Sequence, residues 1–159
     1  MRSLRPFLTA VAASLGRLVT PRLLGTATAE IPEDTVRAAT RDALPAFETG
    51  DGEIVTSDGT FYAARDTTAL APLADCLAVL PYRPTRFDCE NFAGAYRTLA
   101  AFVLGVNAVG VVYDWSAGHA YTLLVDADGG ARLYEPQDDR EVELGESDLY
   151  VGEDVLVVF

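Results

Sequence analysis

The sequence predicts an α+β fold, in which helices come first along the chain and pack on an antiparallel sheet. Apolar residues follow helical spacing in several segments before Gly105, and short β-prone runs follow it to the last residue, Phe159. Half of the 159 residues are hydrophobic, which is enough for one sizeable core. Helices and strands that are separated along the chain are typical of α+β domains. We therefore expect one domain over residues 31–159, preceded by an arm and linker over residues 1–30.

The arm is basic, although the rest of the chain is acidic. Four arginines precede the first acidic residue, Glu30: Arg2, Arg5, Arg17 and Arg22. Apolar residues between them follow helical spacing, and the Ala-x-Ala ending at residues 27–29 resembles that of a signal peptide. Two of the arginines lie between the apolar stretch and that ending, which fits a signal peptide poorly. We expect residues 1–24 to form a helical arm that docks on a partner chain in an oligomer or larger assembly. Docking on a membrane surface and packing on its own domain are the alternatives.

Composition excludes several classes of protein. The chain has 24 acidic and 12 basic residues, so its net charge of −12 would repel nucleic acid. All the basic residues are arginine, and acidic excess without lysine indicates a salt-loving source, or the ordinary acidic surface of a GC-rich genome. No apolar run reaches the 18 residues of a membrane span. Two cysteines are too few for a disulfide scaffold, and the spacing of Cys76 and Cys89 neither requires nor excludes a bridge.

The first half of the domain is expected to alternate between helix and strand. Pro32 suits the first turn of a helix that runs to about Leu44. Residues 48–64 hold three glycines between short β-prone pieces, which predicts a turn-rich β segment. Residues 71–82 read as a short helix that ends near Pro81, with Cys76 inside its apolar run as a core residue.

The second half is expected to be one long helix followed by the sheet. The helix runs from about Cys89 to Val103 and ends at Gly105. Three β-prone pieces follow, over residues 107–115, 119–137 and 154–159. The middle piece reads as a hairpin around the turn DADGG.

A cysteine stands at the start of the long helix, where sulfur chemistry is favoured. Asp88 is the expected N-cap, so Cys89 would lie beside unpaired backbone N–H groups and the positive end of the helix dipole. Both favour the thiolate, which is the nucleophilic form. The chain has a single histidine, His119, at the head of the hairpin, and we take it as the candidate base.

An acidic residue on the next strand completes the set. If the hairpin loop holds an odd number of residues, His119 shares a face of the sheet with Glu135 and Gln137. A strict two-residue turn would instead offer Pro136 and Asp138. We expect Glu135 to orient the imidazole, with Gln137 as the second choice.

The segments FDCENFAGA, GHAYTLLV and YEPQ, in that order, resemble the papain-like and transglutaminase-like cysteine hydrolases. The resemblance covers about residues 46–159, and is nearest to small tailed-virus proteins similar to the papain-like C-terminal domain of a fungal agglutinin. It implies a papain-like core and a peptidase or amidase that acts on a peptide or amide substrate. Cys89 would be the nucleophile, His119 the base and Glu135 the orienter. No upstream oxyanion donor is evident, so the N–H of Cys89 and Asn91 would serve.

Other functions compete with this one. The fold could serve as a non-catalytic structural protein of a tailed virus that docks through its arm, in a virion or in the cytoplasm of a salt-loving host. Trp115 either lines a substrate groove or caps the core. A single histidine and two separated cysteines predict no metal site, and no cofactor is expected. No residue pattern points to carbohydrate binding.

Overall fold

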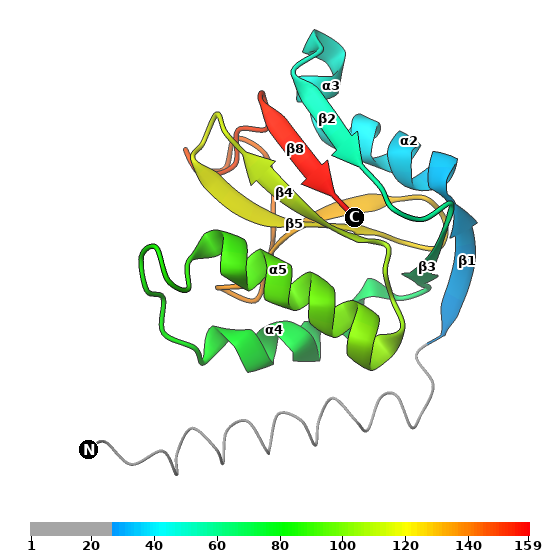
Figure 1. Cartoon of the computed structure of the whole chain (residues 1–159), viewed down its shortest axis with the longest axis horizontal. Coiled ribbons are helices and arrows are strands. Elements are labelled where there is room, and N and C mark those ends of the chain that lie inside the picture. Colours follow the sequence, from blue (N-terminus) through cyan, green and yellow to red (C-terminus); the bar gives the residue numbers. More distant parts are fainter. Residues whose placement is uncertain (1–26) are drawn as a thin grey trace.

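The larger of two sheets forms the centre of the molecule, as seen in the computed structural model, which describes residues 27–159 (Figure 1). Its strand order is β2-β8-β4-β5-β6-β7, and every neighbouring pair is antiparallel except β2 and β8. The strands are β2 (Gly52–Val55), β4 (Val109–Asp114), β5 (His119–Val125), β6 (Ala131–Glu135), β7 (Arg140–Val142) and β8 (Val155–Val158). The sheet is therefore mixed, but mostly antiparallel.

A second, two-stranded sheet begins the described part of the chain. Strand β1 (Thr28–Pro32) pairs antiparallel with β3 (Thr60–Ala64). The linker predicted within residues 1–30 therefore ends in a strand, which its run of small residues did not indicate. The predicted basic arm falls in residues 1–26, outside the described residues.

Helices cover both faces of the large sheet (Figure 1). Helix α2 (Glu33–Ala43) packs on one face, while α4 (Ala71–Ala78) and α5 (Cys89–Leu99) lie on the other. Short helices run over Ala46–Thr49 (α3) and Thr67–Leu70, and a π-helical turn over Ala100–Leu104 prolongs α5. Gly105 ends this turn with φ 70°, a left-handed conformation that glycine adopts without strain.

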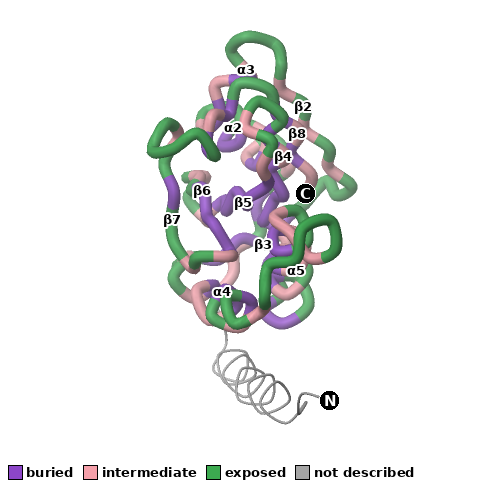
Figure 2. The backbone as a smooth tube through the Cα atoms, turned by 90° about the vertical axis from the view of Figure 1, so that its left-hand side faces the viewer, coloured by how far each residue is buried: buried purple, intermediate pink, exposed green. Residues whose placement is uncertain are grey.

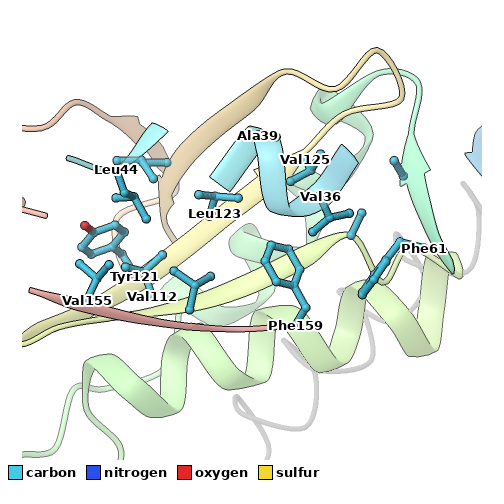
Figure 3. Close-up of a cluster of buried hydrophobic side chains, with 14 of the residues drawn as sticks. Val36, Ala39, Leu44, Phe61, Val112, Tyr121, Leu123, Val125, Val155 and Phe159 are labelled. Atoms are coloured by element: carbon cyan, nitrogen blue, oxygen red, sulfur yellow. The ribbon is translucent and has the colours of Figure 1, made fainter. Parts of the chain in front are cut away.

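The sheet separates two hydrophobic clusters. On the α2 side, Tyr121 and Leu123 of β5 belong to the same cluster as Val36 of α2, as Figure 3 shows. On the α5 side, Leu124 packs with Tyr96. This division follows from the alternation of side chains along a strand, and the burial colouring of Figure 2 marks β5 as the central buried strand.

The coarse sequence prediction is confirmed: the fold is α+β with a mostly antiparallel sheet. The expected helix from Cys89, its end at Gly105 and the hairpin around residues 126–130 are all present. The parallel pairing of β2 with β8 and the strand β7 were not predicted. Across residues 27–159, no helix has the length and apolar character needed to cross a membrane. The division into arm and domain stays a prediction.

Candidate functional site

The imidazole of His119 is held by a buried carboxylate. Its Nε2 lies 2.7 Å from Oε2 of Glu135, a residue that is only 2% exposed. The same oxygen accepts a 3.1 Å hydrogen bond from the hydroxyl of Tyr150. The other carboxylate oxygen accepts from the backbone N–H and the side-chain amide of Gln137. Every oxygen of this buried group is thus hydrogen-bonded, which burial of a charge requires.

The hairpin register explains why these side chains meet. Five residues, 126–130, separate β5 from β6, and Thr122 pairs with Tyr134. The odd loop length puts His119 and Glu135 on one face, as the sequence predicted for a bulged turn. Gln137 contacts the carboxylate rather than the imidazole. Tyr150 was missed, because nothing in its local sequence marks it as a partner of Glu135.

Electrostatics keep the carboxylate charged. Burial raises the pKa of Glu135, but hydrogen bonds from His119 and Gln137 lower it more, and its net pKa is below the ordinary 4.5. The pKa of Tyr150 is raised, by burial and by the adjacent Glu135. Because the folded pKa of Glu135 is depressed, its contribution to stability is present above pH 4.5 and is lost as the pH falls through the folded value.

Cys89 opens α5 as predicted, with Asp88 at the N-cap position. One carboxylate oxygen of Asp88 accepts from the backbone N–H of Thr85, and the side-chain oxygen of Asn91 accepts from the backbone N–H of Asp88. Asn91 thus braces the helix start.

The thiolate predicted for Cys89 is not favoured. Burial raises the pKa of its thiol, and this outweighs the lowering by the backbone N–H groups of Ala120 and Glu90. The helix-start donors that lower the pKa of Cys89 can be predicted from the sequence. The loss of water around the sulfur, which raises that pKa more, depends on the tertiary fold.

The sulfur of Cys89 and the imidazole of His119 both lie near the start of β5. His119 alternates with Ala120, so its ring shares the face of Tyr121, with ring centroids 6.2 Å apart. Helix α5 packs on the opposite face, and the sulfur of Cys89 lies by the N–H of Ala120. Among the described residues, no hydrogen bond joins this sulfur to the imidazole. The structure therefore pairs His119 with Glu135 and places Cys89 beside the neighbouring backbone.

A groove runs between α5 and the strands β4 and β8. Its volume is about 530 Å³, and its polar lining comes from Glu90, Asn91, Arg97 and Thr98. Tyr113 of β4 lines it as well, and the ring of Trp115 stacks on that of Tyr113 at 5.9 Å with an angle of 16°. We call this region the α5 groove.

Trp115 is a surface residue. Its side chain is 61% exposed, so it does not cap the core, which was one of the two roles predicted for it. Its backbone N–H donates to the carbonyl of Asp154 at 2.8 Å, which fixes the residue at the end of β4. An exposed tryptophan that stacks on a half-buried tyrosine at the edge of a polar groove is typical of a binding surface.

The two cysteines are both free thiols. Cys76 is half-buried and donates to the carbonyl of Pro72, so it belongs to the α4 packing and not to the site. Within residues 27–159, no group of three His, Cys, Asp or Glu side chains could hold a metal ion.

Comparison with known proteins gives a fold but no family. No protein-family model matches the chain, and no curated protein matches it. Similar solved structures include PSL1a in complex with E64, and Polyporus squamosus lectin bound to the human-type influenza-binding epitope Neu5Acα2-6Galβ1-4GlcNAc. Each has a TM-score of 0.61 and covers 82% of this chain, at 20% and 21% identity respectively. The chain spans about half of each, 51% and 49%.

These matches correct the functional prediction. The similar structures are of a lectin, which contradicts the papain-like and transglutaminase-like cysteine hydrolase resemblance and the peptidase or amidase activity drawn from it. The papain-like core is not confirmed, and the mixed α+β description replaces it. Neither match supports the structural virus protein, the virion or the salt-loving source, so these predictions are withdrawn as well.

Proposed function

We propose that this protein binds carbohydrate, and that the α5 groove with Trp115 is its binding site. The exposed ring of Trp115, stacked on Tyr113 at the edge of that groove, is the observation that carries the proposal. A sugar ring has one apolar face and a polar rim. An exposed aromatic ring can stack against the apolar face of the sugar. Nearby polar side chains can form hydrogen bonds with its polar rim.

The groove supplies those polar partners from one helix. Glu90 and Asn91 lie two turns before Arg97 and Thr98 on α5, and all four line the same hollow. They offer both acceptors and donors, as the hydroxyl groups of a sugar require. The lectin bound to a sialylated trisaccharide, whose fold is similar, supports the choice of ligand class.

Trp115→Ala should weaken binding of Neu5Acα2-6Galβ1-4GlcNAc at least about tenfold, since a central tryptophan carries a large share of binding energy. Isothermal titration calorimetry on the full chain measures the affinity. Tyr62→Ala is the matched control, because Tyr62 is an exposed aromatic (46%) on β3, away from the groove. Equal affinities of wild type and Trp115→Ala would contradict the proposed site.

The three predicted catalytic residues form a separate proposal. We propose that Cys89, His119 and Glu135 act as one thiol–imidazole–carboxylate unit, in which the imidazole accepts the thiol proton when the side chain of Cys89 turns toward it. The 2.7 Å contact of His119 with Glu135 supports the imidazole–carboxylate pair of this unit. The alkylation rate of Cys89 tests the thiol–imidazole pair.

We also propose that residues 1–24 bind a partner chain. The proposal rests on the sequence alone, which combines four arginines with apolar residues at helical spacing. Deletion of residues 1–24 should lower the molar mass measured by light scattering to that of a monomer. A full-length chain that is already monomeric would contradict partner binding between copies.

A further inference from the structure

The loop between α4 and α5 forms a second hollow, next to the α5 groove along the chain. This pocket has a volume of about 350 Å³ and is lined by Leu80, Pro81, Arg83, Arg86 and Phe87. Its last lining residue, Phe87, lies three residues before Glu90, which lines the α5 groove. The pocket and the groove are therefore close along the chain, near the start of α5.

The pocket is built on a fixed turn. The backbones of Arg83 and Phe87 hydrogen-bond to each other in both directions, at 2.8 and 2.9 Å. Phe87 packs edge-on against Phe92 of α5, with ring centroids 4.6 Å apart. The backbone N–H of Thr85 donates to the carboxylate of Asp88 at the N-cap. The two arginines are thus presented by an anchored loop.

Within residues 27–159, neither Arg83 nor Arg86 makes an ion pair or a side-chain hydrogen bond. The same holds for Arg41, Arg65 and Arg97, whereas Arg37, Arg132 and Arg140 each pair with a carboxylate. Arg83 and Arg86 differ from the other unpaired arginines because both line one hollow. In a chain with twice as many acidic as basic residues, two unpaired arginines around one hollow make a local positive site. A guanidinium binds a carboxylate through two parallel hydrogen bonds.

We propose that this pocket binds the carboxylate of an acidic sugar, and that the ligand of the protein is an acidic glycan. This inference rests on the proposed function, because the rest of the glycan would occupy the α5 groove. The apolar walls from Leu80, Pro81 and Phe87 suit the carbon skeleton of the sugar, and the arginines its charge. The volume lies at the low end of the range for small-ligand pockets, which fits a single sugar unit.

The test compares Neu5Acα2-6Galβ1-4GlcNAc with its methyl ester, which differs only in the charge of the carboxyl group. Wild type should bind the free acid about 10- to 100-fold more tightly, as expected for hydrogen bonds to charged groups. Arg83→Gln combined with Arg86→Gln should remove that preference and leave ester binding unchanged. The control, Arg41→Gln with Arg65→Gln, removes the same charge from exposed arginines elsewhere and should keep the preference.

The outcomes separate the two proposals. Equal binding of acid and ester by wild type would overturn the carboxylate pocket and leave carbohydrate binding intact. A preference that the control pair also loses would overturn it too, since net charge alone would then explain the effect. Binding of neither sugar would overturn both proposals.

Discussion

Asp114→Ala should lower the free energy of unfolding by about 4 kcal/mol, the largest stability effect we expect from one substitution. Asp114 is fully buried at the end of β4, and its carboxylate accepts five hydrogen bonds. The donors are the hydroxyls of Ser116 and Tyr121 and the backbone N–H groups of Ala117, Val151 and Gly152. Asp114 therefore joins the β4–β5 turn, which begins at Trp115, to the loop before β8.

The cost follows from the donors that would be left behind. In the alanine variant the hydroxyl of Tyr121 and the N–H of Gly152 stay buried without an acceptor, and each costs about 1–3 kcal/mol. For a chain of 159 residues this corresponds to a melting temperature lower by about 8–16 °C, which calorimetry measures. Asp42→Ala, at an exposed position on α2, should change it by less than about 2 °C. A small shift for Asp114→Ala would mean that these bonds contribute little.

The second large effect concerns the reactivity of Cys89. In a Cys76→Ser background, His119→Ala should slow alkylation of Cys89 by iodoacetamide at pH 7.5 at least about tenfold. The reason is that burial raises the pKa of the thiol, so near neutral pH the sulfur is protonated and needs a base. Above the raised pKa the thiolate forms without help, and the rates of the two proteins should converge.

Glu135→Gln refines this test. The amide of the variant can still face the imidazole, but it carries no charge. In the wild type the backbone N–H of Gln137 donates to the carboxylate of Glu135, and in the variant this N–H would meet the NH₂ group of the amide. We expect an intermediate rate at pH 7.5, with the near-ultraviolet circular dichroism of each variant as the control for folding. Equal rates for wild type and His119→Ala at pH 7.5 would show that Cys89, His119 and Glu135 do not act as one unit.

Local patterns in the sequence were sufficient to predict the long helix and the hairpin. The helix from Cys89 is set by its apolar spacing and by Gly105, and the register that brings His119 to Glu135 follows from the length of one loop. Both features depend on residues close together in the chain. Strand β2 pairs with β8 from the far end of the sequence, and no local pattern encodes that partner.

The candidate site could be predicted only in part, for the same reason. The donors around Cys89 can be read from the helix start, but its raised pKa depends on burial by distant elements. Tertiary packing also decides whether α5 lies on the same face of the sheet as His119, so the local sequence does not predict it. Whether Trp115 lies on the surface or over the core could not be decided from YDWSAGH alone, because exposure is set by what packs around it.

Trp115 is the only tryptophan of the chain, so its fluorescence reports on the proposed binding site directly. The most direct measurement is a titration of the full-length protein with Neu5Acα2-6Galβ1-4GlcNAc, following this emission and its quenching by acrylamide. If a sugar ring covers the exposed indole, the emission changes to saturation and quenching decreases. The contradicting result is that calorimetry detects binding while the emission and its quenching by acrylamide stay constant. The ligand would then bind elsewhere, and the α5 groove would not be its site.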